Sequence, residues 1–301
     1  MAAFSVVTGA FSYTGKYIAQ RLLALGHPVK TLSRRRPQVA DPRLAVAPID
    51  FTDSAGLINE LRGAAVLFNT YWVRFPYGQT TFEQAVVNTE RLIRAAGDAG
   101  VPRIVHLSVT NASVTSRLPY FRGKGLVENA IVRSGLSYAI IRPTLIFGPE
   151  DILLNNIAWL LRRLPLFGIA GSGRYRVQPV SVEEVADLAV EAGGRSSNIV
   201  QDAVGPETYT FDALVRLMAD AVGSRARVVH LPPAITLLIV ALLGRVVHDV
   251  VLTDDELQGL MAGLLVSGGP ATGSRRFSEW LAQHAGTLGL VYANELDRHH
   301  R

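Results

Sequence analysis

Short apolar runs alternate with longer amphipathic stretches through the first two hundred residues of this chain. Runs that indicate strands, each bounded by turn residues or charges, occupy 3–8, 28–33, 43–49, 64–69, 103–108 and 136–143. Residues 14–26 and 80–100 lie between such runs, repeat apolar side chains three and four apart, and end at glycine, as helices commonly do. This alternation predicts an α/β fold with a doubly wound, Rossmann-type parallel sheet.

The alternation changes after Pro149. Residues 151–168 show a helical pattern that is apolar on most faces, and from Pro206 onward the chain has the pattern of helices with short breaks. We therefore predict two domains. The dinucleotide-binding domain is assigned to 1–148 and 176–205, and a smaller, mainly helical substrate-side lobe to 149–175 and 206–301.

Composition excludes several classes of site. The chain has no cysteine, which excludes disulfides, thiolate nucleophiles and cysteine-ligated metals. Its seven histidines lack ligand spacing, so we predict no metal site. The net charge is +5, but apart from Arg34–Arg36 the basic residues are too dispersed for a nucleic-acid-binding face. The first residues lack the basic start of a signal peptide, so we expect a cytoplasmic protein. The oligomeric state stays open.

The stretch TGAFSYTG at 8–15 is the first candidate site. Gly9, Ser12 and Gly15 take the spacing of a G-x-x-G-x-x-G turn, with serine at the second position. A helix starting near Thr14 would direct its free N–H groups and positive dipole end at a pyrophosphate. The glycines alone support a phosphate site and a mere tight corner equally. The predicted lining is Gly9, Phe11, Ser12, Tyr13, Thr14 and Gly15.

Residues after the second and third strands bear on the choice of cofactor. Ser33, Arg34 and Arg35 stand where an NAD site carries a carboxylate for the adenosine ribose. A guanidinium binds a phosphate in a bidentate manner, so we predict NADP(H) in preference to NAD(H). Asp50 and Phe51 are candidates to border the adenine.

A tyrosine and a lysine form the candidate catalytic pair. Tyr120 and Lys124 are four residues apart, so on a helix they share a face. A lysine ammonium beside a phenol lowers the pKa of the tyrosine, which suits Tyr120 to protonate a carbonyl. Ser108 and Thr110 follow a strand, at the sheet edge where such folds bind ligands. Thr110 would hold the substrate carbonyl.

Taken in order, these motifs resemble the atypical and extended branches of the short-chain dehydrogenase/reductase superfamily. The resemblance covers roughly the first 210 residues. It is carried by 8–15, 50–53, 87–108, the Tyr120–Lys124 pair, 140–148 and 177–189. Within the superfamily, the chain looks like the group that includes the NADPH-binding accessory subunit of respiratory complex I and its bacterial NAD(P)-dependent, epimerase-like relatives. Those relatives bind NADPH, and several have no demonstrated turnover.

The resemblance implies a role for each candidate. Gly9, Ser12 and Gly15 would line the pyrophosphate, Arg34 and Arg35 the 2′-phosphate, Asp50 and Phe51 the adenine, Thr70 and Lys124 the nicotinamide-side ribose, and Pro143 the nicotinamide. Tyr120 would be the acid and Thr110 its hydroxyl partner. Tyr71 and Trp72 replace a His-Leu-Ala-like run of the extended enzymes, so they would crowd or cap the cofactor.

Three functions follow from these residues. The leading prediction is an NADPH-dependent oxidoreductase that reduces a small, largely apolar carbonyl or quinone-like substrate. One alternative is an NADPH-binding redox sensor or assembly factor without turnover. The other, nucleotide-sugar epimerisation, is weakened because Arg176 does not clearly match the arginine that binds the sugar nucleotide's diphosphate.

The most apolar stretch lies at 232–247 and has no charge between Pro232 and Gly244. It is shorter than the roughly 20 residues that a membrane-spanning helix needs. We expect a helix packed within the lobe or lining an apolar pocket. A helix lying on a membrane surface is the less favoured alternative, because such helices usually carry more lysine and arginine.

Overall fold

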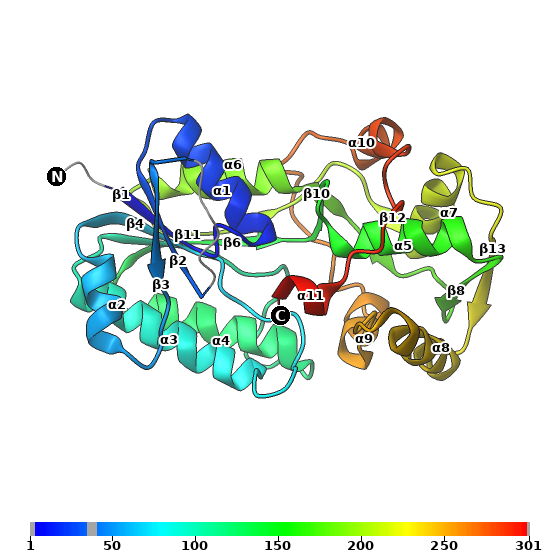
Figure 1. Ribbon diagram of the computed structural model, residues 1–301, viewed down its shortest axis with the longest axis horizontal. Helices are drawn as coiled ribbons and strands as arrows, with labels where there is room; N and C mark the ends of the chain where they lie inside the picture. The colour runs from blue at the N-terminus through cyan, green and yellow to red at the C-terminus, as the bar shows by residue number, and fades with distance from the viewer. Residues whose placement is uncertain (1–3, 35–40, 300–301) are drawn as a thin grey trace. The chain divides into compact units, whose positions relative to one another are not determined.

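The computed structural model describes residues 4–34 and 41–299 and divides the chain into two compact units (Figure 1). Unit 1 comprises Met1–Pro143 and Val182–Ala203, and unit 2 comprises Thr144–Ser181 and Val204–Arg301. The chain therefore passes between the units three times. Residues 176–181, which the sequence analysis assigned to the dinucleotide-binding domain, lie in unit 2.

Unit 1 is built on a parallel sheet. Its strands among the described residues are β1 (Phe4–Thr8), β2 (Val29–Ser33), β3 (Leu44–Pro48), β4 (Ala64–Asn69), β5 (Arg103–Leu107), β6 (Ser137–Pro143) and β11 (Ile199–Ala203). They lie in the order β11-β6-β5-β4-β1-β2-β3, and every neighbouring pair is parallel. This order confirms the predicted doubly wound Rossmann-type fold.

Helices cover both faces of this sheet (Figure 1). One face carries α1 (Tyr13–Ala24) and α6 (Val182–Gly193), and the other carries α2 (Ser54–Leu61), α3 (Phe82–Asp98) and α4 (Pro119–Arg133). Asp53 and Thr81 cap the starts of α2 and α3. The side chain of each accepts a hydrogen bond from the backbone amide three residues further along the chain. The core between the sheet and α2–α4 is aliphatic, with Leu67, Leu92, Ile104, Val127 and Ile140 at most 1% exposed.

Parallel register brings distant residues to one edge of the sheet. Asn69 pairs with His106, and Leu107 pairs with Ile141, so β4, β5 and β6 end side by side. The residues that follow these strands, including Thr70, Ser108 and Thr110, therefore share the carboxyl edge, where ligands bind in such folds.

Unit 2 combines helices with pairs of short strands. Its helices are α5 (Ile152–Arg163), α7 (Phe211–Ala221), α8 (Pro233–Val247), α9 (Asp254–Met261), α10 (Phe277–His284) and α11 (Glu295–His299). Its strand pairs are β7 (Leu145–Phe147) with β10 (Pro179–Ser181), β8 (Leu166–Ala170) with β13 (Arg227–Leu231), and β9 (Arg176–Val177) with β12 (Tyr209–Thr210). A separate core includes Phe147, Leu154, Leu214 and Phe277.

The apolar stretch at 232–247 forms α8, which packs against β8 within unit 2, as expected, but the lobe does not enclose the helix. Only Thr236 of this helix is buried, and most of its aliphatic side chains are partly or largely exposed. Within the described ranges, no helix has both the length and the hydropathy needed to cross a membrane.

Candidate functional site

The glycine turn between β1 and α1 requires small residues. Gly9 has a φ of +73°, which is the left-handed region that favours glycine. Ser12 closes the turn, because its amide and its Oγ both donate to the Gly9 carbonyl, at 2.8 and 2.6 Å. A Cβ on Gly15 would lie 2.2 Å from the same carbonyl oxygen. Glycine at position 15 therefore lets α1 pack directly on the turn.

The start of α1 suits an anion. Ser12 is the N-cap, but its side chain makes no hydrogen bond to the N–H groups of the first turn, and that turn holds no acidic residue. The positive end of the helix dipole is therefore not neutralised by the chain's own carboxylates. Phe11, Tyr13 and Thr14 surround this start, with the Tyr13 ring edge-on to Tyr17. The turn thus fits the pyrophosphate of a dinucleotide.

The structure describes most of the residues that are predicted to bind the adenosine half of the cofactor. Ser33 ends β2, and Arg34 follows it as an exposed residue, while Arg35 lies outside the described residues. Asp50 accepts hydrogen bonds from the amide and hydroxyl of Thr52, at 2.8 and 2.7 Å, and these bonds lower the pKa of Asp50. The Phe51 ring packs against the Tyr71 ring, with centroids 4.6 Å apart.

Thr70 and Tyr71 join β4 to the glycine turn. The Thr70 hydroxyl donates to the Thr8 carbonyl, and its amide donates to Thr8 Oγ1 at 2.8 Å. A Cβ on Gly15 would lie 3.0 Å from Thr70 Oγ1, so the hydroxyl lies over the turn, as a ribose-side residue should. The Tyr71 hydroxyl accepts from Asn88 Nδ2 at 2.9 Å, which fixes the ring beside Phe51.

Tyr120 and Lys124 both lie on α4, and both contact the indole of Trp72. The Tyr120 ring meets Trp72 edge-on at 6.1 Å and also contacts the rings of Phe82 and Phe121. Lys124 Nζ lies 4.7 Å from the centre of the Trp72 ring. A Cβ on Gly123 would come within 2.8 Å of the indole, so glycine at this position makes room for Trp72.

Lys124 is enclosed by the protein. The residue is 4% exposed, and its ammonium donates to the Leu107 carbonyl at 2.7 Å. Burial lowers the pKa of Lys124 to about 7, although the charge of Glu128 acts in the opposite direction. This lysine is therefore close to losing its charge at neutral pH.

A buried histidine that the sequence analysis did not select lies near Lys124. Asn69 Oδ1 accepts from Thr8 and from the Tyr71 amide, so its Nδ2 is the donor to His106 Nδ1 at 3.0 Å. A neutral His106 then carries its proton on Nε2, which has no hydrogen-bond partner among the described residues. Burial and the Lys124 charge hold the pKa of His106 well below its usual range.

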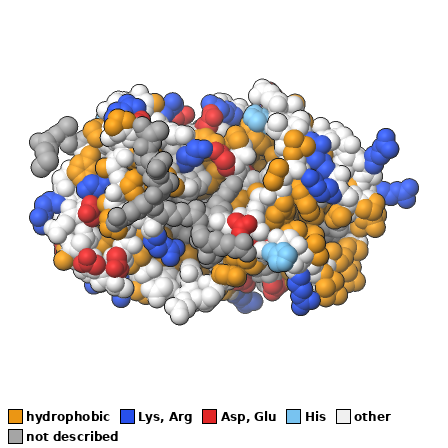
Figure 2. Space-filling view, viewed as in Figure 1, with side chains coloured by type: hydrophobic (Ala, Val, Ile, Leu, Met, Phe, Trp, Pro, Cys, Tyr) orange, Lys and Arg blue, Asp and Glu red, His pale blue; other side chains and the backbone are white. Residues whose placement is uncertain are grey.

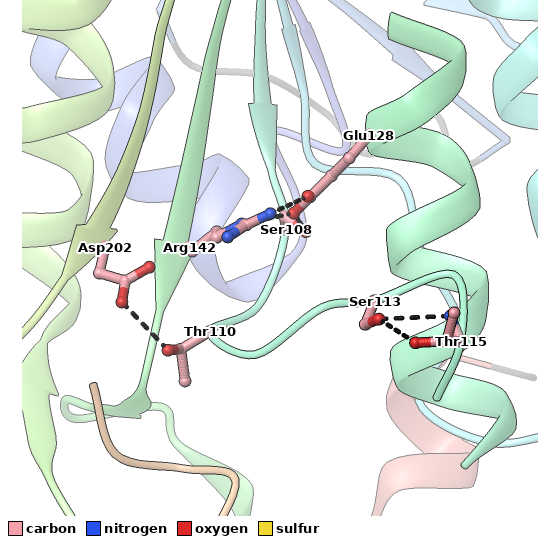
Figure 3. Close-up of polar contacts among 7 residues, drawn as sticks. All are labelled: Ser108, Thr110, Ser113, Thr115, Glu128, Arg142 and Asp202. Atoms are coloured by element: carbon pink, nitrogen blue, oxygen red, sulfur yellow. Dashed lines mark hydrogen bonds and ion pairs between the residues drawn. The ribbon is translucent and has the colours of Figure 1, made fainter. Parts of the chain in front are cut away.

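Polar side chains from the loop after β5 and from β6, β11 and α4 form two groups of contacts at the sheet edge (Figure 3). Arg142 and Glu128 point toward one another and form a paired contact, with Nε to Oε1 at 2.9 Å. Ser108 Oγ donates to Glu128 as well, so the predicted cofactor residue Ser108 is engaged inside the protein. Thr110 Oγ1 donates to Asp202 Oδ2 at 3.3 Å.

Thr110 and Pro143 are neighbours at this edge, because the Thr110 amide donates to the Pro143 carbonyl at 3.0 Å. The sequence analysis did not select Glu128, Arg142 or Asp202. Arg142 lies within the run IIRP, and Glu128 is one helical turn from Lys124. Neither position indicates from the sequence alone which side chain it would pair with. The described residues contain no cluster of three or more His, Asp or Glu side chains that could hold a metal ion.

Comparison with protein families agrees with this geometry. Residues 9–152 match a family described as NAD(P)H-binding. Subunit 9 of the NADH dehydrogenase [ubiquinone] 1 alpha subcomplex, mitochondrial, from Arabidopsis thaliana is 27% identical over 241 residues, which cover 76% of this chain and 60% of that protein. The photosystem II assembly factor Ycf39 of Cyanidium caldarium is 23% identical, with 79% of this chain and 78% of that protein covered.

Solved structures share the fold. A nucleoside-diphosphate-sugar epimerase from Staphylococcus aureus matches with a TM-score of 0.74 and 14% identity, over 93% of this chain and 99% of that one. MoeE5 in complex with UDP-glucuronic acid and NAD matches with a TM-score of 0.64 and 19% identity, over 76% and 86%. Residues 9–152 therefore match an NAD(P)H-binding family, and the chain shares its fold with solved nucleotide-sugar epimerases, in agreement with the resemblance that the motifs predict.

Proposed function

We propose that this protein binds NADP(H) at the glycine turn and keeps the nucleotide as a structural or redox-sensing group, without turning it over. The observation that carries this proposal is the position of Lys124. Its ammonium donates to the Leu107 carbonyl and lies against the Trp72 indole, in a residue that is 4% exposed. A reductase of this superfamily would need that ammonium at the ribose and beside the catalytic phenol.

The surroundings of Tyr120 and Lys124 also support nucleotide binding without turnover. Burial lowers the pKa of Lys124 to about 7, so the ammonium is less favoured there than on an exposed lysine and stabilises a phenolate less well. Tyr120 is surrounded by the rings of Trp72, Phe82 and Phe121. Trp72 thus contacts both Tyr120 and Lys124, and we infer that this aromatic packing disfavours proton transfer by Tyr120.

The printed names of the relatives point the same way. They describe subunits of NADH dehydrogenase and a photosystem II assembly factor, so they refer to a larger complex. We extend this to the present chain as a role in the assembly or maintenance of a multisubunit complex. The epimerases share only the fold, at low sequence identity, and carry no activity over to this chain.

The preference for NADP(H) rests on charge. Arg34 is exposed directly after β2, and no carboxylate stands at the end of that strand to bind the ribose of NAD. Arg35 follows in the sequence. We propose that these guanidiniums bind the 2′-phosphate.

Reduction of a small apolar carbonyl is the second candidate, and one observation favours it. Thr110, Asp202 and Pro143 lie together at the carboxyl edge of the sheet, where a substrate of this fold would approach. The bound nucleotide would supply the hydride, and Thr110 would hold the substrate oxygen. Tyr120 would then have to supply the proton.

Tyr120→Phe separates the two candidates, because it removes the phenol and keeps the ring. NADPH and NADH binding would be titrated by fluorescence, and NADPH oxidation followed with a panel of aldehydes, ketones and quinones. We expect wild type and Tyr120→Phe to bind NADPH equally and to oxidise it equally slowly. A loss of roughly 10²–10⁴-fold in the variant, typical of general acid catalysis, would establish the enzyme instead.

Arg34→Ala combined with Arg35→Ala tests the cofactor part separately. NADPH affinity should fall by about tenfold or more, as expected for a lost charge-assisted contact, while NADH affinity stays unchanged. Equal weakening of both nucleotides, or none, would remove the 2′-phosphate role. Arg62→Ala, a change of a basic residue elsewhere on unit 1, is the matched control.

A further inference from the structure

The helix α8 presents an apolar row to solvent. Ile235, Leu238, Ile239, Leu242 and Val246 are between 45% and 74% exposed. Their spacing of three and four residues places them along one side of the helix. We call these five residues the α8 face. Figure 2 shows hydrophobic side chains gathered over this helix.

The α8 face belongs to a firmly held element. On the inner side, Thr236 is buried, and α8 packs against β8. At the C-terminal end, His248 adopts a φ of +54°, and its backbone N–H donates a hydrogen bond to the Gly244 carbonyl, which closes the helix. Asn294 Nδ2 then donates to the Val247 carbonyl at 3.2 Å, and the adjacent Asp249 is buried. The apolar row is therefore part of a fixed surface.

Charge around the helix indicates what covers it. Arg245 is the charged residue of α8 itself, and Arg225 and Arg227 precede the helix in sequence; all three are exposed. The carboxylates nearest in sequence lie outside this span, at Asp220, at the buried Asp249 and in the first turn of α9. In sequence, the arginines therefore stand on both sides of the uncharged run. Arginines near an exposed aliphatic row are typical of a helix that binds a membrane surface, where anionic headgroups lie over an apolar interior.

β8, the strand against which α8 packs, also exposes an aliphatic side chain. Leu166 on β8 is 54% exposed and pairs in register with Arg227 on β13. An arginine is thus the strand neighbour of an exposed leucine, and on a bilayer it would meet a phosphate at the level of lipid headgroups.

The composition of the row argues against a protein partner. The cores of protein interfaces are enriched in aromatic residues, methionine and arginine, whereas the α8 face is wholly aliphatic. A stable pair of copies buries roughly 800 Å² on each partner, which is more than five half-exposed aliphatic side chains supply. At 15 residues, α8 is about 22 Å long, too short to cross a bilayer.

We propose that the α8 face docks unit 2 on the surface of an anionic lipid bilayer. The helix lies in the plane of the interface, with Leu238 and Leu242 in the outer acyl region. Arg225, Arg227 and Arg245 contact lipid phosphates. This inference does not depend on what the nucleotide site of unit 1 does.

Vesicle flotation tests the proposal with the full chain. The vesicles are phosphatidylcholine mixed with phosphatidylglycerol, or phosphatidylcholine alone. Wild type should float with the mixed vesicles, and Leu238→Ser with Leu242→Ser should lower its partition by about tenfold or more. Val132→Ser, at a residue 49% exposed on α4 of unit 1, is the matched control and should float like wild type. Arg225→Gln with Arg227→Gln should weaken binding to the mixed vesicles only.

A labelling experiment keeps the proposal testable if the serine variant does not fold. The chain has no cysteine, so Leu238→Cys and Val132→Cys each provide a single site for an environment-sensitive fluorophore. The dye at 238 should shift to the blue with mixed vesicles, and the dye at 132 should not. Absence of binding by wild type overturns the proposal. So does a wild-type dimer in solution that Leu238→Asp dissociates, because the occupant would then be a second copy.

Discussion

A single backbone oxygen limits the choice of residue at position 15. Any side chain there would begin 2.2 Å from the Gly9 carbonyl oxygen, and the obstacle is main chain that cannot rotate away. Gly15→Ala should therefore lower the free energy of unfolding by about 3 kcal/mol, the upper range for overpacking. NADPH binding should be lost with it, because the turn must open.

Gly97→Ala is the matched control for this variant. No atom lies within 4 Å of a Cβ at position 97, and the residue is helical. Its free energy of unfolding should rise by about 0.5 kcal/mol, because alanine restricts the unfolded chain. The midpoints of urea unfolding of Gly15→Ala and Gly97→Ala provide the measurement. Equal midpoints would contradict the close packing at Gly15.

The second residue whose environment predicts a measurement is Lys124. Its pKa is about 7 in the folded protein and near 10.5 when unfolded, because burial disfavours the ammonium. Between these values the unfolded chain holds more protons, so the free energy of unfolding should rise with pH, by roughly 1.4 kcal/mol per unit at most. The effect is absent above the unfolded value.

Lys124→Met isolates this contribution. Urea unfolding at several pH values from 7 to 10 should show a shallower pH dependence in the variant than in wild type. Parallel curves would mean that the ammonium remains charged within the fold.

At the scale of elements, Glu128 fastens α4 to the sheet. It accepts from Ser108 after β5 and from Arg142 on β6 (Figure 3), and its side chain is 8% exposed. Glu128→Gln keeps the shape and removes the charge, so it leaves Arg142 without its carboxylate. We expect a loss of about 2 kcal/mol or more in the free energy of unfolding.

A double-mutant cycle checks this expectation. Arg142→Met alone also removes the ion pair, and the double variant should cost less than the sum of the two single changes. Additive losses would show that Glu128 and Arg142 act separately.

Most of the sheet is predictable because its strands are short, apolar and separated by helical patterns. The edge strand β11 is not, since IVQDA carries two polar residues in five and lacks a clear period. The two- and three-residue strands of unit 2 are too short for any periodicity. They are therefore visible only once the chain has folded.

The candidate site likewise contains residues that the sequence predicts and residues that it does not. Gly9, Gly15 and the Tyr120–Lys124 pair show a local spacing, so the sequence predicts them. Asp202 and Glu128 acquire their partners from strands far away in the chain, and nothing in their neighbours marks them. Similarly, hydropathy predicts α8 but does not indicate which of its sides the rest of unit 2 leaves uncovered.

At the scale of the whole molecule, each of the two units has a hydrophobic core of its own. One lies within unit 1 and includes Leu67 and Ile104, and the other lies within unit 2 and includes Phe147 and Phe277. Because the glycine turn belongs to unit 1, NADPH at a hundred times its Kd should stabilise that unit by about 2.7 kcal/mol. Hydrogen exchange should slow in β1, β4 and β5 and stay unchanged in α5 and α7.

Peptides from both units, followed by mass spectrometry with and without NADPH, provide the measurement. NADH at the same concentration is the control and should protect unit 1 less. Equal slowing in both units would mean that they unfold as one body.

The order of β11 in the chain determines how a newly made copy matures on the ribosome. This strand forms the edge beside β6, yet residues 144–181 of unit 2 are synthesised between the two. Until Ala203 leaves the exit tunnel, β6 has an unpaired edge that can template wrong pairing. A translational pause within 144–198 would prolong this exposure, so the nascent chain should depend on chaperones longest at this stage.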